Sequence, residues 1–251
     1  MRRAGRDRHG APAAAREAGA RSAGAVEGRA VRWPRRPTMT EIERPGAQQW
    51  VPEGADIPAL REAATACRGC ELWEPASQVV FSAGPPSASI VMVGEQPGDQ
   101  EDRRGQPFVG PAGTLLVQAI RDAGIDPASV YRTNAVKHFR FELRGARRLH
   151  KTPETVHITA CRPWLHAELQ DLAPQIVVAL GATAGRSLFG RPVRIGAERG
   201  RVLEGAIPDS TARSLLTAHP SSVLRMQRDP GYDAAYESLV TDLRTAAAVV
   251  G

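Results

Sequence analysis

Short apolar runs alternate with segments of helical periodicity from about Ile57 to the end of the chain. Four runs have the length and β-branched content of strands: Ser89–Val93, Val130–Asn134, Gln175–Leu180 and Ser214–Thr217. Further helical segments are expected near 111–124, 181–189 and 230–249. Strands that alternate with helices usually form a parallel sheet with helices on both faces. The pattern therefore predicts one α/β domain.

A helix start signal lies between the second and third predicted strands. Thr152 can serve as the N-cap, Pro153 is tolerated in the first turn, and Glu154 is well placed against the helix dipole. We therefore predict a helix with Thr152 as its N-cap. The apolar residues that fall near one face of it are Val156, Ala160, Trp164 and Leu165.

The first 38 residues differ in composition from the rest of the chain. They hold 10 arginines and 3 acidic residues and show no hydrophobic periodicity. Such a segment cannot bury enough apolar surface to offset its ordering entropy, so we expect it to be disordered. We interpret residues 1–38 as a translated upstream stretch with Met39 as the true start, against the alternative of a DNA-grasping arm. Residues 39–56 are then a linker, and residues 57–251 form the domain.

The net charge of +6 does not by itself indicate a nucleic-acid-binding protein. Residues 39–251 hold 23 basic and 24 acidic side chains, so this part is close to neutral. DNA binding must therefore be argued from a local patch. The apolar runs are shorter than the ~20 residues that a membrane helix needs. No apolar segment of a secretory signal is present near the start, so we expect a cytoplasmic protein.

Polar residues cluster directly after three of the four predicted strands. The first strand runs into Gly94–Asp99 and then into the Gly/Pro-rich loop Pro107–Gly113. The second strand ends at Asn134, and the fourth leads into His219–Ser222. Ligands of open parallel sheets bind beyond the carboxyl ends of the strands. We therefore expect these clusters to meet at one sheet edge and to form a binding site.

Each of these residues has a chemical and a structural interpretation. Glu95 can stabilise positive charge or position a water, or it can be an ordinary turn carboxylate. Phe108 can stack on an extruded base or plug the core. The Asn134 amide can pair with the edge of a pyrimidine or cap a turn, and His219 can hydrogen-bond a leaving group or satisfy a turn. Their expected convergence favours the functional interpretation.

The chain has three cysteines, an odd number that argues against a disulfide framework. Cys67 and Cys70 form a CxxC pair, and Cys161 lies far downstream. Such a pair is compatible with a redox pair, a zinc half-site or an iron–sulfur half-site. Three thiolates need a fourth ligand, and imidazole is an accepted substitute. The candidate histidines outside the first segment are His138, His150, His157, His166 and His219.

Six ordered motifs between about residues 57 and 247 resemble one known family. They are Cys67-x-x-Cys70, Gly94-Glu-Gln-Pro-Gly98, Pro107-Phe-Val-Gly-Pro-Ala-Gly113, Thr133-Asn-Ala-Val-Lys137, Cys161-Arg-Pro-Trp164 and His219-Pro-Ser-Ser222. Together they look like the family 4 branch of the uracil-DNA glycosylase superfamily. The resemblance implies a three-layer α/β/α sandwich with a central, mainly parallel four-stranded sheet. It also implies a 4Fe-4S cluster, which that family holds with four cysteines.

Two departures from the family 4 pattern carry information. His138 stands where those enzymes have a cysteine, so the implied cluster ligands are Cys67, Cys70, His138 and Cys161. A basic segment, residues 144–153, is added before the helix that bears Cys161. Both features resemble the UdgX group, whose members become covalently trapped on uracil-containing DNA through a histidine of this loop. The corresponding residue here is His150.

The resemblance also implies a role for each site residue. Glu95, His150 and His219 are implied to be catalytic: Glu95 stabilises an oxocarbenium-like sugar, His219 hydrogen-bonds a uracil oxygen, and His150 captures C1′. The implied uracil-binding residues are Gln96, Phe108 and Asn134. The basic loop forms a cationic patch that can contact phosphates, or it can be a solvated surface loop. The candidate DNA contacts are Arg144, Arg147, Arg148, Lys151, Ser221 and Arg225.

Three functions are compatible with these residues. The first, which we favour, is a uracil-DNA glycosylase that excises uracil once and remains covalently linked to the DNA. The second is a conventional family 4 glycosylase that turns over. The third is a non-catalytic iron–sulfur module that binds DNA or nucleotides. For the first we expect a monomer, a single-stranded uracil-containing DNA partner and an association with the nucleoid.

Overall fold

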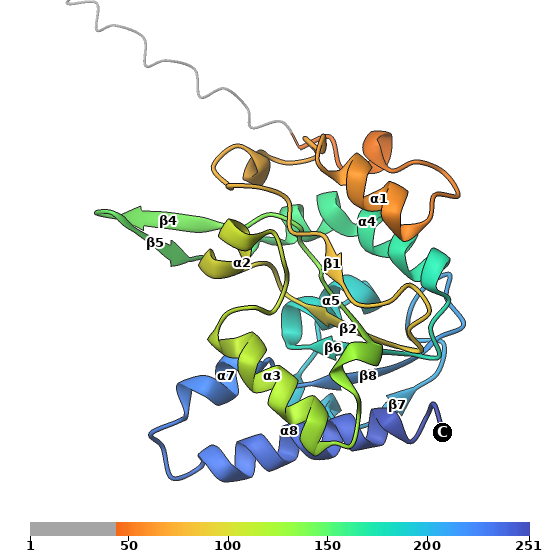
Figure 1. The fold of residues 1–251 in the computed structure, drawn as a ribbon, viewed down its shortest axis with the longest axis vertical. Helices are drawn as coiled ribbons and strands as arrows, with labels where there is room; N and C mark the ends of the chain where they lie inside the picture. Colours follow the sequence, from red (N-terminus) through yellow and green to blue (C-terminus); the bar gives the residue numbers. More distant parts are fainter. Residues whose placement is uncertain (1–43) are drawn as a thin grey trace, which may run out of the picture. The chain divides into compact units, whose positions relative to one another are not determined.

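The computed structural model describes residues 44–251, which form a six-stranded sheet with helices on both faces (Figure 1). The strands follow the order β1-β3-β2-β6-β8-β7 across the sheet. The four central strands are parallel: β2 (Ile90–Gly94), β3 (Val130–Asn134), β6 (Ile176–Leu180) and β8 (Arg213–Thr217). The two edge strands, β1 (Ser82–Ala83) and β7 (Val202–Leu203), are antiparallel. The predicted fold and its four strands are confirmed, and two short edge strands are added to the sheet.

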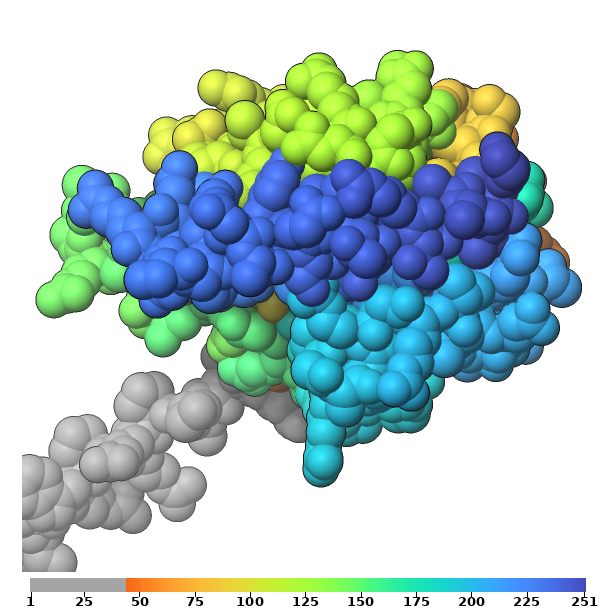
Figure 2. Space-filling model, turned by 90° about the horizontal axis from the view of Figure 1, so that it is seen from below, coloured from red at the N-terminus to blue at the C-terminus, as the bar shows by residue number. Residues whose placement is uncertain are grey.

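Three helices contribute to the hydrophobic core on each face of the sheet. On one face they are α1 (Ile57–Ala64), α4 (Thr155–Leu172) and α5 (Ala182–Phe189), and on the other α3 (Pro111–Asp122), α7 (Pro220–Arg225) and α8 (Tyr232–Ala247). The sheet supplies both cores by alternation: in β2, Val91 and Val93 face α1 and α4, whereas Ile90 and Met92 face α3 and α8. Figure 2 shows α8 lying along α3.

The remaining elements are short. They are the helices α2 (Asp99–Arg104) and α6 (Ile195–Glu198), the 3-10 turns Gln48–Trp50, Glu71–Trp73 and Pro127–Ser129, and the hairpin strands β4 (Phe141–Arg144) and β5 (Arg147–His150). The β4–β5 hairpin projects from the body of the domain (Figure 1). No helix within residues 44–251 is long and apolar enough to cross a membrane.

The helix for which we predicted Thr152 as the N-cap starts two residues later, at Thr155. Glu154 is its N-cap and forms a capping box with His157. Arg140 donates a hydrogen bond to the carbonyl of Thr152 at 2.5 Å and forms an ion pair with Glu154. These contacts keep residues 152–154 outside the helix, and no local sequence signal reports them.

Residues 44–56, which we interpreted as part of a linker, pack against the domain. Ala47 is 1% exposed, and its N–H donates to the carbonyl of Ala160 in α4 at 2.8 Å. The N–H of Gly46 donates to the carbonyl of Gly69 at 3.0 Å, inside the CxxC segment. The expectations for residues 1–38 and for Met39 lie outside the described residues.

Candidate active site

A cavity of about 650 Å³ lies at the carboxyl ends of the parallel strands. The loops that follow β2 and β8 contribute to its wall, as do the last residue of β3 and the end of the β4–β5 hairpin. The polar clusters therefore meet as the parallel topology requires. The predicted site residues that line it are Gln96, Phe108, Asn134, His150, His219, Ser221 and Arg225.

Glu95 faces His150, which lines this cavity. Oε1 of Glu95 lies 3.3 Å from Nε2 of His150, and the side chains are 20% and 47% exposed. Glu95 follows β2, and the N–H of Val136 donates to its carbonyl at 3.0 Å, which continues the pairing between β2 and β3. Burial lowers the pKa of His150, and the positive charge of Arg225 acts in the same direction, whereas Glu95 opposes the shift. A neutral imidazole and a carboxylate are thus held side by side.

His219 adopts a defined tautomer. Its Nδ1 accepts hydrogen bonds from the backbone N–H of Ser221 at 3.1 Å and from the Ser221 hydroxyl at 2.9 Å. Because a backbone N–H can only donate, the ring proton of the neutral histidine must be on Nε2. Burial lowers the pKa of His219 to about 4, with His150 and Arg225 as further causes. His219 can therefore donate a hydrogen bond from Nε2 as a neutral ring.

Phe108 and Asn134 are packed against the end of β2. A Cβ at Gly94 would lie 2.4 Å from Asn134 Oδ1 and 2.7 Å from the Phe108 ring. Phe108 has a φ of 58°, in the left-handed region that is uncommon for an aromatic residue. A Cβ at Gly113 would lie 2.0 Å from the Phe108 carbonyl oxygen, so only glycine fits there. These glycines allow the ring and the amide to stand at one end of the cavity.

The Gln96 side chain ties down the hairpin that carries His150. Its Nε2 donates to the carbonyls of Arg140 and Lys151 at 3.1 Å and 3.0 Å, and its Oε1 accepts from the Arg140 N–H at 3.0 Å. The side chain is thereby engaged with the backbone on both sides of the hairpin. Gln96 lines the cavity, but its contacts are those of a hairpin anchor and not those of a free uracil-binding amide.

The basic residues of the hairpin fall into two groups. Arg148 forms ion pairs with Asp99 and Asp102 at 2.6 Å each, and Lys151 pairs with Glu142 at 2.8 Å. These two cations hold the hairpin rather than project freely. Arg144 and Arg147 are opposite each other at the hairpin tip and are exposed. Among residues 44–251 neither of these two forms an ion pair.

The three cysteines are free thiols, and they and His138 are between 6% and 7% exposed. Burial raises the pKa of Cys70 to about 11 and that of Cys161 to about 12, so both thiols are protonated at neutral pH when no cation lies beside them. The Trp164 indole N–H and the Lys137 backbone N–H donate to the sulfurs of Cys67 and Cys161, both at 3.3 Å.

The described residues contain no group of three His, Cys, Asp or Glu side chains that converges on a single metal ion. In a four-iron cluster each iron takes its own protein ligand, so the ligands stand apart. Three buried thiols, two of which accept N–H hydrogen bonds, and one buried imidazole fit such a cluster better than a single ion.

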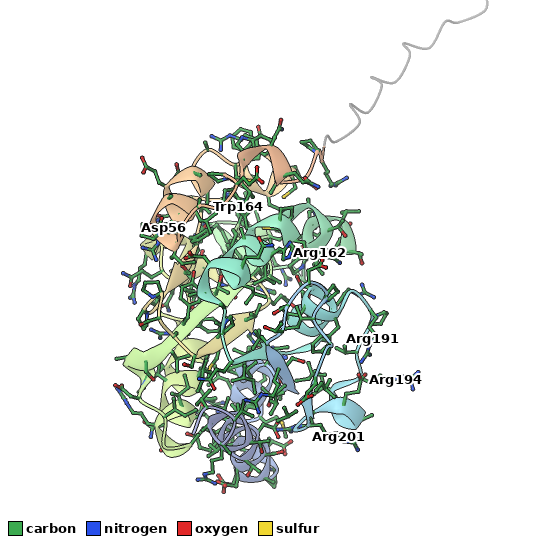
Figure 3. The ribbon with its side chains drawn as sticks, turned by 90° about the vertical axis from the view of Figure 1, so that its right-hand side faces the viewer. Asp56, Arg162, Trp164, Arg191, Arg194 and Arg201 are labelled. Atoms are coloured by element: carbon green, nitrogen blue, oxygen red, sulfur yellow. The ribbon has the colours of Figure 1, made fainter. Side chains whose placement is uncertain are left out.

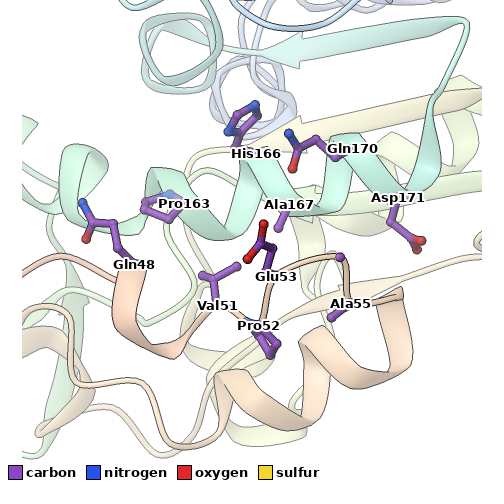
Figure 4. Close-up of a pocket in the computed structure, with 11 residues that line it drawn as sticks. Gln48, Val51, Pro52, Glu53, Ala55, Pro163, His166, Ala167, Gln170 and Asp171 are labelled. Carbon is purple, nitrogen blue, oxygen red and sulfur yellow. The ribbon is translucent and has the colours of Figure 1, made fainter.

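A second cavity of about 560 Å³ lies between residues 48–55 and α4 (Figure 4). Its polar lining includes Glu53, His166, Gln170 and Asp171. None of the residues that we predicted for catalysis, for uracil or DNA binding or for the cluster lines this cavity.

Two site features were missed in the sequence. Thr183, directly after β6, donates a hydrogen bond from its hydroxyl to Oε2 of Glu95 at 2.5 Å. Its position beyond a parallel strand was the only signal in the sequence, and residues 181–185 around it hold no charged or aromatic side chain. The carboxylates of Asp99 and Asp102 were also missed as partners of Arg148, because nothing local links them to the hairpin.

Comparison with known proteins identifies relatives. Residues 81–244 match the family described as the Uracil DNA glycosylase superfamily. The type-4 uracil-DNA glycosylase of Thermotoga maritima is 38% identical over 161 residues, which is 63% of this chain and 78% of that protein. The type-4 enzyme of Pyrobaculum aerophilum is 32% identical over 174 residues, 68% of this chain and 85% of its own. That of Sulfurisphaera tokodaii is 37% identical over 133 residues, 53% of this chain and 57% of its own.

Proposed function

Because the chain belongs to the uracil DNA glycosylase superfamily, we propose that it excises uracil from DNA and becomes covalently linked to the remaining sugar through His150. The observation that carries this proposal is the position of the His150 ring. Its Nε2 lies 3.3 Å from Glu95 Oε1 at the cavity that Phe108, Asn134 and His219 line. A nitrogen nucleophile there competes with the water that a turnover enzyme uses.

Uracil recognition is assigned to three side chains of the cavity. Phe108 stacks on the extruded base, and the Asn134 amide pairs with its hydrogen-bonding edge. The Nε2–H of His219 donates to a uracil oxygen, where negative charge collects as the base departs. Since His219 is neutral, it stabilises this charge as a donor and does not form an ion pair.

The covalent step replaces one bond to C1′ with another. The bond between C1′ and N1 of uracil breaks, and its electron pair leaves with the base. The negative charge of Glu95 stabilises the oxocarbenium-like sugar. The lone pair on Nε2 of the neutral His150 ring, whose proton is on Nδ1, then forms a bond to C1′. The imidazolium that results loses its Nδ1 proton to solvent, and the uracil anion takes up a proton from solvent. The products are free uracil and a carbon–nitrogen adduct between the protein and the DNA.

The test is a denaturing gel of the protein mixed with a uracil-containing oligonucleotide and, separately, with its thymine counterpart. We expect a heat-resistant and detergent-resistant adduct with the uracil strand only. An alkali-labile abasic strand without any adduct would contradict covalent capture, and an untouched uracil strand would contradict glycosylase activity. Parallel reactions on single-stranded and duplex DNA test our expectation that the single strand is preferred.

A conventional turnover glycosylase is the second candidate. It is favoured by the name type-4 uracil-DNA glycosylase, which relatives 32% to 38% identical to this chain carry. This candidate releases uracil in large excess over the protein, whereas the self-trapping enzyme releases one uracil per molecule.

The pH dependence of adduct formation follows from the state of His150. A protonated imidazole has no lone pair on Nε2, and the pKa of His150 is lowered from 6.5. The adduct rate should therefore be level at neutral pH and fall as pH drops through a midpoint below 6.5. A further fall is expected near pH 4, where His219 becomes protonated. Initial rates in a pH series check this, and a midpoint above the ordinary histidine value would contradict it.

We propose that Cys67, Cys70, Cys161 and His138 hold a 4Fe-4S cluster. A bound cluster would link three parts of the chain: the CxxC segment, the residues that follow β3, and helix α4. Its role would be structural. The residues themselves prepare the site by burial and by the N–H donors to Cys67 and Cys161. Replacing His138 with alanine should lower the iron and sulfide content measured after purification. The matched variant His166→Ala should keep wild-type content; equal content in both would contradict His138 as a ligand.

DNA contacts are assigned to the hairpin tip and to the rim of the cavity, where Ser221 and Arg225 lie. Arg147→Ala should weaken binding to uracil-containing and thymine-containing DNA alike. It should also reduce the slope of log affinity against log salt by about 1, because one phosphate contact is lost. The matched control is Arg201→Ala, since Arg201 lies with Arg191 and Arg194 at an outer edge near α6 (Figure 3). Equal salt slopes for both variants would remove Arg147 from the interface.

A further inference from the structure

Thr183 contacts the Glu95 carboxylate but takes part in none of the steps above. Its hydroxyl donates to Oε2 at 2.5 Å, while Oε1 of the same carboxylate lies 3.3 Å from His150 Nε2. The two oxygens of Glu95 therefore have different partners. The terminal torsion of a glutamate is broad, so a hydrogen bond to one oxygen decides where the other points.

The backbone around Thr183 is tightly constrained. The preceding strands β2 and β6 are parallel neighbours, so Glu95 and Thr183 leave the sheet at the same edge. Gly181 has a φ of 89°, and its N–H donates to the carbonyl of Thr217 at 2.9 Å. A Cβ at Gly181 would lie 2.9 Å from Cβ of His219. The turn between β6 and α5 thus packs on His219 and presents Thr183 to Glu95 from a fixed position.

We propose that Thr183 is a positioning residue for the glycosylase reaction, an inference that rests on the proposed function. Its hydroxyl holds Oε2, and Oε1 is thereby directed at His150 and at the space where C1′ of the sugar is attacked. A carboxylate that is free to rotate spends less time in this orientation. Misplacement of a catalytic group by about 1 Å can cost on the order of 100-fold in rate. Thr183 therefore acts on both chemical steps and not on DNA binding.

A purely structural role makes different predictions. Thr183 lies in the first turn of α5, where a hydroxyl can also stabilise a helix end. In that case its loss would lower the melting temperature and leave the reaction at its normal rate. Thr155, in the first turn of α4, is the matched control because its hydroxyl accepts from Arg186 at 2.7 Å and has no contact with Glu95.

The experiment compares Thr183→Val, Thr183→Ser and Thr155→Val with the full-length wild-type protein. Single-turnover rates of uracil release and adduct formation are measured at saturating uracil-containing oligonucleotide, together with the DNA concentration for half-maximal rate. Thr183→Val should lose about 10- to 100-fold in both rates with an unchanged half-maximal concentration. Thr183→Ser, which keeps the hydroxyl, should stay near wild type, as should Thr155→Val.

A double-mutant cycle separates a role through Glu95 from an independent role. In a Glu95→Gln background, Thr183→Val should cause a much smaller further loss than it does alone. Wild-type rates in Thr183→Val, a serine variant as slow as the valine variant, or full additivity with Glu95→Gln would each overturn the inference. Loss of adduct with normal uracil release in the wild type would contradict only covalent capture, because the release rate still reports on Thr183. Absence of uracil release from the wild type would instead contradict the proposed function.

Discussion

His150→Ala should abolish the covalent adduct while uracil release continues. The ring of His150 stands beside Glu95 and lines the cavity, and we propose that it takes the place of the attacking water. Alanine vacates that space, water can capture C1′, and the protein is set free after each reaction. The number of uracil molecules released per protein should therefore rise from one to many. A denaturing gel and a uracil-release assay on the same samples measure both effects.

The control for this variant is His166→Ala. His166 lies on α4 at the second cavity (Figure 4) and has no contact with the active site. We expect it to form the adduct at the wild-type level. An adduct that persists in His150→Ala would show that another nucleophile is used, and loss of both adduct and uracil release would indicate that His150 supports bond cleavage itself.

Glu95→Gln should slow uracil release by about 100- to 1000-fold, because it removes the charge that stabilises the oxocarbenium-like sugar. The amide has nearly the same shape, and its oxygen can still accept from Thr183, so the fold should persist. Adduct formation should slow in parallel, since His150 captures C1′ only after the base begins to leave. Single-turnover release of uracil at saturating DNA is the measurement.

Glu142→Gln is the matched control for the loss of a carboxylate near the hairpin. Glu142 is exposed on β4 and pairs with Lys151 at 2.8 Å. An exposed ion pair contributes little to stability, so near-wild-type rates are expected. If Glu95→Gln were also to react at the wild-type rate, the carboxylate would have no part in the chemistry.

Much of the site could be predicted because parallel strands impose a simple geometry. The apolar runs before Glu95, Asn134 and His219 end at the same edge of the sheet, so these residues must lie close together. Phe108 was also predicted, from its Gly/Pro-rich loop, although its left-handed backbone was not. Local composition and strand periodicity thus specified the fold class and most of the cavity wall.

Side-chain partners could not be predicted in the same way. Gln96 was expected to bind uracil, yet its amide joins the two sides of the hairpin, 44 and 55 residues away in the chain. Arg148 was expected at the DNA but pairs with Asp102, 46 residues away. A charge or an amide has several possible partners, and the distance along the chain does not identify the one it meets.

The sequence by itself therefore determined which chemical groups lie at this edge of the sheet. Each group directly follows an apolar strand, and the strands are predicted to be parallel, so the groups must lie at the same edge. Only the tertiary structure decided how those groups are oriented. It turned the basic segment into a hairpin anchored by Gln96 and Arg148, and it placed Thr183 on one oxygen of Glu95 across 88 residues of chain. Strand periodicity is a local property, whereas the pairing of polar side chains depends on the packing of the whole domain.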